Sequence, residues 1–252
     1  MTFRRLIARL IEHASGNYVV APKDVLFLPE RLHLTRLFNH YAVDCVFDVG
    51  ANDGQYARFL RRSVGFRGPI ISYEPIPELA RRMAERATAE GDKHWHIEAL
   101  ALDREAGPAT FHIAHADQFS SLRMPAATQP AEFRQANSLA RAVSVTRSTV
   151  AAEFAKWQSA LGFKRPFLKM DTQGNDLAVV EGAGASLVHY VGLQTEMALE
   201  RLYDGAPDFV EALAVLKGKG FEPSAFVPNN AGHFPALYEI DCIMYNRARA
   251  AG

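Results

Sequence analysis

Short apolar runs alternate with stretches of helical periodicity along most of the chain. The first two apolar runs are Cys45–Val49 and Pro69–Tyr73. A helix is expected between them over Asp53–Ser63, and another follows over Pro77–Glu90. Such alternation is typical of βαβ units, which place parallel strands in one sheet with helices on its faces. The sequence therefore predicts an α/β fold.

The pattern continues towards the C-terminus with one interruption. Residues 115–142 are polar with weak periodicity, which indicates a long loop or flap. The last two expected strands have no helix between them, so we expect an antiparallel hairpin at one edge of the sheet. Further strands are expected at His94–Leu102, Ala109–Ala114, Val143–Val145 (as an edge strand), Pro166–Met170, Val191–Met197, Phe221–Val227 and Leu237–Tyr245, and helices at Thr149–Ala160, Asp176–Glu181 and Ala206–Lys219.

The first 44 residues differ from the rest of the chain. An amphipathic helix is expected over Phe3–Ile11 and a second helix over Pro29–Tyr41. We expect residues 1–44 to act as a helical lid or oligomer arm and residues 45–252 to form the main domain. Because the first helix is basic and amphipathic, contact with a membrane surface stays an alternative. A homo-oligomer also stays open.

Composition excludes several classes of protein. Hydrophobic residues make up 48% and charged residues 22%, so the chain is globular rather than disordered. Lys plus Arg and Asp plus Glu both number 28, and without a basic excess we expect no nucleic acid as partner. The chain has neither an apolar run long enough to span a membrane nor a signal-peptide pattern, so we expect a cytoplasmic protein without stable membrane insertion. Cys45 and Cys242 lie in apolar runs and are expected to be buried small residues.

The first expected strand ends in a turn bracketed by glycines, Gly50 and Gly54, with Asn52 between them. Ligands of open α/β sheets bind at the carboxyl ends of the strands. Gly50 permits a tight turn and gives a ligand access to bare backbone, while a helix starting near Asp53 points free N–H groups at the same place. The turn is therefore a candidate ligand site, with an ordinary capped turn as the alternative.

Acidic residues recur at the ends of the expected strands, namely Asp48, Glu74, Asp103 and Asp171. Glu74 follows Gly54 by 20 residues, the place where an acidic side chain binds the hydroxyls of a ribose. Carboxylates around the turn would repel the pyrophosphate of NAD, and the glycine spacing is not GxGxxG. The same carboxylates suit S-adenosylmethionine, which carries a positively charged sulfonium and an ammonium group. An NAD-dependent oxidoreductase and a non-catalytic cofactor-binding or oligomerisation module stay open as alternatives.

In this order, the motifs resemble those of the FkbM-type S-adenosylmethionine-dependent methyltransferases. The resemblance covers about residues 40–246. It implies a Rossmann-like, seven-stranded class I methyltransferase sheet that is mostly parallel with an antiparallel last strand, accompanied by the N-terminal helices. The matching pieces are 48–56 (DVGANDGQY), 73–75 (YEP), 99–103 (ALALD), 120–122 (SSL), 167–174 (FLKMDTQG), 194–196 (QTE) and 239–242 (EIDC).

The resemblance also implies roles for individual residues. Asp48, Gly50 and Asn52 would hold the methionine end of the cofactor, Glu74 the ribose hydroxyls, and Asp103 with its neighbours the adenine. Gly54 and Ser121, from two matching pieces, complete the expected cofactor-binding set. The family pattern has glutamate where this chain has Asp176, which leaves the role of Asp176 open beyond the start of a helix.

The family resemblance implies O-methyl transfer. The methyl acceptor would be a hydroxyl group of a small molecule or glycan, such as a sugar, a glycan or a secondary metabolite. An alcohol acceptor needs a base within hydrogen-bonding reach. Asp171 and Glu196, both at expected strand ends, are the candidate bases, and His115 at the start of the flap is a secondary candidate. No metal is expected, with a divalent ion on Asp171, Asp176 and Glu196 as the alternative.

Overall fold

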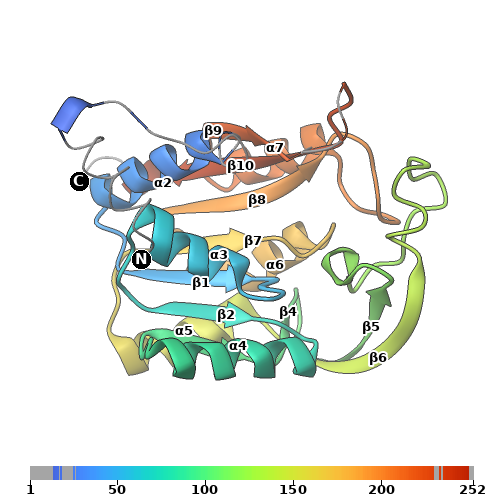
Figure 1. Ribbon diagram of the computed structural model, residues 1–252, viewed down its shortest axis with the longest axis horizontal. Coiled ribbons are helices and arrows are strands. Elements are labelled where there is room, and N and C mark those ends of the chain that lie inside the picture. The colour runs from blue at the N-terminus through green and yellow to red at the C-terminus, as the bar shows by residue number, and fades with distance from the viewer. Residues whose placement is uncertain are drawn as a thin grey trace.

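A seven-stranded sheet forms the centre of the computed structural model, which describes residues 14–16, 18, 25, 27–229, 233 and 235–249. The helix expected over Phe3–Ile11 lies outside these residues. The strand order is β3-β2-β1-β7-β8-β10-β9 (Figure 1). The strands are β1 (Cys45–Val49), β2 (Ile70–Tyr73), β3 (Trp95–Glu98), β7 (Pro166–Met170), β8 (Gly192–Ala198), β9 (Phe221–Pro228) and β10 (Glu239–Asn246).

Only β10 runs against its neighbours in this sheet. It pairs antiparallel with β8 on one side and with β9 on the other, whereas the remaining pairs are parallel. The mostly parallel sheet with an antiparallel last strand is therefore confirmed, as is the hairpin at the edge. Chain order reverses across β1, with β2 on one side and β7 on the other, and ligands of open α/β sheets bind at such a point.

Helices cover both faces of the sheet. Clusters of buried side chains place α5, α6 and α7 on one face and α2, α3 and α4 on the other. No helix in the described part of the chain combines the length and the apolar composition that a membrane crossing requires. The helices are α2 (Leu28–His40), α3 (Gln55–Phe59, continued by a π-helical turn over Leu60–Val64), α4 (Pro77–Glu90), α5 (Val150–Leu161), α6 (Asp176–Ala183) and α7 (Phe209–Gly218), with short 3₁₀ turns at Asp117–Phe119, Gly184–His189 and Arg247–Arg249.

The central strands are buried along their whole length, which explains their continuous apolar runs. Every residue of β1 and of β7 is buried. Alternate residues face opposite clusters, so Phe47 packs with α5, α6 and α7 while Val46 packs with α2, α3 and α4. Cys45 and Cys242 are buried and unpaired, as expected.

A second sheet, not expected from the sequence, lies beyond the carboxyl ends of the parallel strands (Figure 1). The run His94–Leu102 is not one strand, because it divides into β3 and β4 (Ala101–Leu102), which belong to different sheets. The strand expected at Val143–Val145 is longer, β6 (Leu139–Ser148), and is not an edge strand: it lies between β4 and β5 (Gly107–Ala114). Most of the β6 side chains are exposed, so the strand has little hydrophobic signal. The expected flap connects β5 to β6.

Candidate functional site

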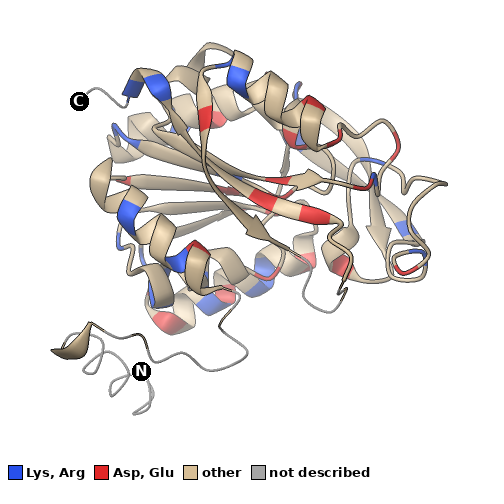
Figure 2. Ribbon diagram, turned by 90° about the horizontal axis from the view of Figure 1, so that it is seen from above, with Lys and Arg blue, Asp and Glu red and all other residues tan. Residues whose placement is uncertain are grey.

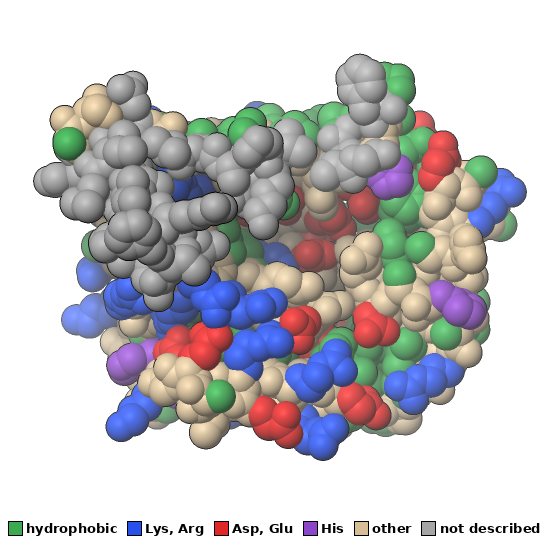
Figure 3. Space-filling view, in the orientation of Figure 1, with side chains coloured by type: hydrophobic (Ala, Val, Ile, Leu, Met, Phe, Trp, Pro, Cys, Tyr) green, Lys and Arg blue, Asp and Glu red, His purple; other side chains and the backbone are tan. Residues whose placement is uncertain are grey.

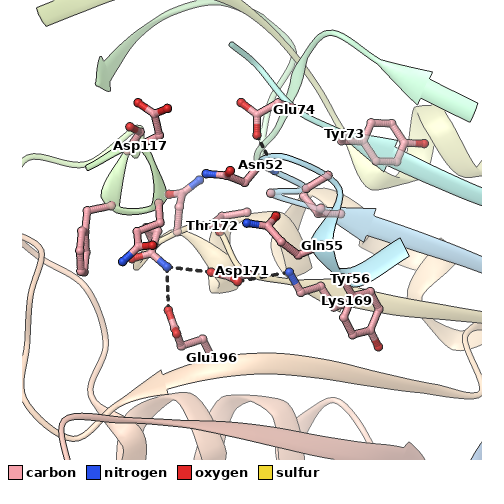
Figure 4. Close-up of a pocket in the computed structure, with 18 of the residues that line it drawn as sticks. Asn52, Gln55, Tyr56, Tyr73, Glu74, Asp117, Lys169, Asp171, Thr172 and Glu196 are labelled. Atoms are coloured by element: carbon pink, nitrogen blue, oxygen red, sulfur yellow. Dashed lines mark hydrogen bonds and ion pairs between the residues drawn. The ribbon is translucent and has the colours of Figure 1, made fainter. Parts of the chain in front are cut away.

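A cavity of about 710 Å³ opens at the carboxyl ends of the central strands, within the range of about 300–1,000 Å³ that is usual for small-ligand sites. Figure 3 shows acidic side chains inside a hollow on this face of the molecule, and Figure 2 shows acidic positions along the central strands while most basic ones lie on the helices around them. Figure 4 shows Glu74 and Asn52 on one side of the cavity, Glu196 on the other, and Asp171 between them. Two halves of the cavity thus meet at Asp171.

Packing, rather than ligand access, requires both glycines of the turn after β1. Gly50 has φ of +77°, and a Cβ there would lie 1.9 Å from the backbone oxygen of Asp171. Gly54 has φ of +72°, and its Cβ would lie 2.5 Å from the ring of Trp95. Gly50 and Asn52 still line the cavity as expected, whereas Gly54 does not.

Glu74 lies at the end of β2 and is 4% exposed. Its carboxylate accepts hydrogen bonds from the backbone N–H groups of Asn52 and Ile76, both at 2.8 Å, which fixes the side chain at the cavity wall. Burial raises the pKa of Glu74 to about 7, against the lowering effect of these two hydrogen bonds. Each oxygen retains a lone pair for a ligand hydroxyl.

Apolar side chains also line the cavity, contributed by Ile76, Ala101, Leu102, Phe111 and Leu122, and all of them except Leu102 pack in one cluster with Ile76, two residues after Glu74. An apolar slot beside the Glu74 carboxylate matches an adenosine, with the base against the apolar wall and the ribose hydroxyls on that acid, and Asp117 adds a second carboxyl group to this side of the lining (Figure 4). The residues present therefore fit the nucleoside part of S-adenosylmethionine.

Asp48 lies beneath the cavity rather than on its surface. It is fully buried, accepts a hydrogen bond from the Ser72 hydroxyl at 2.9 Å and lies 3.8 Å from the ammonium of Lys169. Lys169 does line the cavity and lies 3.3 Å from Asp171. Burial lowers the pKa of Lys169, but Asp171 and Asp48 outweigh it and hold that pKa above its usual value. Sequence reasoning missed Lys169, although a lysine inside a buried strand is itself a signal.

Gln173 connects the two candidate bases. Its amide nitrogen donates to Asp171 at 2.7 Å and to Glu196 at 2.9 Å. The two carboxylates accept from this nitrogen and so fix which way the amide faces, with its oxygen 2.7 Å from the hydroxyl of Tyr203. The same hydroxyl lies 2.9 Å from the backbone oxygen of Phe119 in the flap. Asp171 and Glu196 are therefore brought together and oriented by a residue that sequence reasoning missed.

The half of the cavity beyond Asp171 is a chamber of acids and amides, which we call the acidic chamber: Glu30, Gln194, Glu196, Asn229, Glu239 and Asp241. Burial, together with the nearby carboxyl groups of Glu239 and Asp171, raises the pKa of Glu196 well above its usual value. Burial likewise raises the pKa of Glu239 to about 8 and that of Asp241 to about 7. Asp241 alternates with buried apolar residues along β10, and this was the available signal.

Besides Asp48 and Gly54, three more expected site residues lie outside the cavity lining. Asp103 pairs with Arg147 at 2.6 Å, and only its neighbours Ala101 and Leu102 reach the cavity. The hydroxyl of Ser121 donates to the backbone oxygen of Gln173 at 2.8 Å, so it fastens the flap to the loop after β7. His115 is exposed, and its ring hydrogen-bonds with Ser138.

Comparison with known proteins identifies the family. Residues 48–223 match the family described as Methyltransferase FkbM domain. The chain belongs to the FkbM methyltransferase family. Membership confirms the resemblance seen in the motifs. It also confirms that the cofactor of this FkbM chain is S-adenosylmethionine.

Relatives of known description are distant from this FkbM chain. A protein-L-isoaspartate O-methyltransferase of Ignicoccus hospitalis is 35% identical over 77 residues, which are 31% of this chain and 34% of the relative. The structure of a methyltransferase FkbM from Methylobacillus flagellatus has a TM-score of 0.50 at 12% identity, covering 81% of this chain and 44% of the other. An rRNA methylase of Streptococcus thermophilus has a TM-score of 0.45 at 8% identity, covering 91% and 99%. This chain thus spans about a third of the curated relative and under half of the FkbM structure.

Metal ligation was the remaining alternative for the acids of this FkbM chain. Over the described residues, no group of three or more His, Cys, Asp or Glu side chains is arranged to hold a metal ion. Asp176, one of the three residues considered, is engaged by the backbone and hydroxyl of Thr172 and by Thr195 and Glu196.

Proposed function

We propose that this FkbM protein transfers a methyl group from S-adenosylmethionine to a hydroxyl group of a sugar, glycan or secondary metabolite. One observation carries the proposal: a single cavity joins the apolar slot beside Glu74 to the acidic chamber that holds Glu196, and Asp171 lies between them. The slot suits the nucleoside, and the chamber offers acceptors for the hydroxyl hydrogens of a polar acceptor molecule.

The binding residues divide the work between the two halves. Glu74 accepts hydrogen bonds from the ribose hydroxyls, while Gly50 and Asn52 border the methionine end. Lys169, held between Asp48 and Asp171, presents a fixed positive charge to the methionine carboxylate. S-adenosylmethionine supplies an electrophilic methyl group on a sulfonium.

In this proposal Glu196 is the base and Asp171 the second candidate. The acceptor oxygen forms a bond to the methyl carbon as the carbon–sulfur bond breaks, and its proton passes to the Glu196 carboxylate. Because burial and neighbouring acids raise the pKa of Glu196, its carboxylate is a stronger base than an exposed glutamate. Gln173 fixes the orientation of this carboxylate through its amide. Much of the rate enhancement comes from holding the hydroxyl in line with the methyl group.

A turnover screen tests this function. The purified protein is incubated with S-adenosylmethionine carrying a deuterated methyl group and a set of sugars, glycans and polyketide-type alcohols. The proposal expects release of S-adenosylhomocysteine with at least one hydroxyl acceptor and the label on oxygen in the product, located by fragmentation mass spectrometry. A label found on nitrogen or carbon would contradict O-methyl transfer. Cofactor binding without turnover on any acceptor would favour the non-catalytic module.

Other expectations stay predictions. These are the absence of a nucleic-acid partner, the cytoplasmic location, the homo-oligomer and the division at residue 44. RNA added to the same screen would test the first of them, since labelled RNA would contradict it.

A further inference from the structure

Asp176, the first residue of α6, receives hydrogen bonds from the loop after β7 and from the interior of β8. One carboxylate oxygen accepts from the backbone N–H of Thr172 at 2.8 Å and from the hydroxyl of the same residue. The other accepts from the Thr195 hydroxyl at 2.6 Å and from the backbone N–H of Glu196 at 3.3 Å. The residue is 7% exposed and does not line the cavity. Asp176 can therefore influence the reaction only through the residues that it contacts.

These contacts occur where the parallel pairing of β7 and β8 stops. The last paired residues are Met170 and Thr195, and the next pair in register would be Asp171 and Glu196. Instead the two strands separate, and the amide of Gln173 lies between the two carboxylates. The Asp176 carboxylate spans the gap below them, where backbone hydrogen bonds would otherwise have set the spacing.

We propose that Asp176 is a positioning residue that holds Glu196 in place relative to Asp171, so that the Glu196 carboxylate faces the methyl acceptor. The inference rests on the proposed function, in which Glu196 takes the acceptor proton. It also gives a role to the residue at which this chain departs from the glutamate of the FkbM pattern: a carboxylate is needed here to accept four hydrogen bonds.

Asp176→Asn separates this role from a general contribution to folding. Asparagine has nearly the same shape, but only its oxygen accepts hydrogen bonds. It therefore cannot accept from both backbone N–H groups, of Thr172 and Glu196, which donate to different oxygens of the carboxylate. With its oxygen towards Thr172, its nitrogen faces the backbone N–H of Glu196, and that N–H loses its acceptor on this side of β8. The variant should therefore disturb Glu196 and leave the slot beside Glu74 intact.

Charge gives the variant a second signature. The acids that act on Glu196 are Asp171 after β7, Asp176 of α6, and Glu239 and Asp241 of β10, and all raise its pKa after burial. Removing the charge of Asp176 lowers the pKa of Glu196. The acidic limb of the profile of kcat against pH should move to lower pH, while the plateau falls.

The experiment measures kcat, KM and pH profiles of the full-length protein, with the acceptor identified by the screen. For Asp176→Asn we expect a fall in kcat of about 10- to 100-fold, an unchanged dissociation constant for S-adenosylhomocysteine and the shifted acidic limb. Asp176→Glu, which keeps the carboxylate, should recover most of the rate. Asp208→Asn is the matched control, because Asp208 caps the start of α7 and its carboxylate accepts backbone hydrogen bonds, but it is not part of the cavity lining and makes no contact with Thr172, Thr195 or Glu196.

A uniform loss of rate with an unmoved acidic limb, in a variant that binds cofactor normally, would overturn the inference and leave a structural role only. If Asp176→Asn fails to fold, Thr195→Val removes one of the four hydrogen bonds at nearly constant volume, and a rate equal to wild type would also overturn it.

A titration without turnover keeps the two proposals apart. The Glu196 carboxyl signal in protein labelled with 13C-glutamate, assigned with Glu196→Gln, should titrate at lower pH in Asp176→Asn than in wild type. An unmoved titration contradicts the positioning by Asp176. Failure of wild-type protein to methylate any hydroxyl contradicts the proposed function instead.

Discussion

The backbone oxygen of Asp171 occupies the position that a side chain at Gly50 would need, 1.9 Å from where its Cβ would stand. The turn after β1 and the loop after β7 are thus in contact through bare backbone. This contact lies where the two halves of the cavity meet. We infer that it fixes the floor on which cofactor and acceptor approach each other.

Gly50→Ala should therefore destabilise the protein for two reasons: alanine is strained in a left-handed backbone conformation, and its Cβ would clash with the Asp171 backbone oxygen. Gly65→Ala is the matched control, because Gly65 also has positive φ, +86°, but nothing lies within 4 Å of its added Cβ. We expect Gly50→Ala to lose about 1–3 kcal/mol more than Gly65→Ala in the free energy of unfolding by urea titration. Equal losses would contradict the contact.

The sequence predicted those helices and strands whose own residues show a clear pattern, such as a continuous apolar run or a bounding proline and glycine. β1, β7 and α4 were predicted with their observed bounds, since two are continuous buried runs and the third is bounded by Pro77 and Gly91. The second sheet was not, because β6 exposes most of its side chains and its pairing with β5 is long-range. The candidate site was partly predicted. Acidic residues at the strand ends were named, but the roles of Lys169 and Gln173 depend on contacts with Asp171 and Glu196 that form only in the folded protein.

Cofactor affinity should depend on pH through Glu74. Its pKa is about 7, and ribose hydroxyls donate to the ionised carboxylate, so binding favours loss of the proton. The affinity for S-adenosylhomocysteine should weaken as pH falls below about 7, approaching about tenfold per pH unit. Calorimetric titrations between about pH 5.5 and 8 measure this. The dependence should be much smaller in Glu74→Gln, and an identical slope in both proteins would remove Glu74 from the ribose site.

The acidic chamber should cost stability at high pH when no ligand is bound. The folded protein keeps protons on Glu239 and Asp241 up to pH about 8 and 7, whereas the unfolded chain releases them near pH 4. The unfolded state thus binds fewer protons between these values, and the free energy of unfolding falls as pH rises. We expect the melting temperature to decrease from about pH 5.5 to 8.5.

Glu239→Gln should remove part of that decrease. At about pH 8.5 it is expected to melt about 2–4 °C above wild type, and at about pH 5.5 at nearly the same temperature. Glu200→Gln, an exposed acid outside the lining, serves as control and should change neither value. If the melting temperature of wild type rises with pH instead, the claim that ionisation of these buried acids destabilises the folded protein is wrong.

Glu196→Gln tests the base. The amide keeps the shape of the side chain but cannot take the acceptor proton, so kcat should fall by about 10²- to 10⁴-fold with cofactor affinity retained. Glu200→Gln again provides the control. Full activity in Glu196→Gln together with a large loss in Asp171→Asn would transfer the role to Asp171.

Binding of S-adenosylhomocysteine to wild type and to Glu74→Ala, set against binding of NADH, tests the central claim most directly. By isothermal calorimetry at about pH 8, wild type should bind one equivalent of S-adenosylhomocysteine, and Glu74→Ala should lose about 1.5–3 kcal/mol of that binding free energy. NADH should give no saturable signal. Saturable NADH binding without a response to S-adenosylhomocysteine would contradict the account.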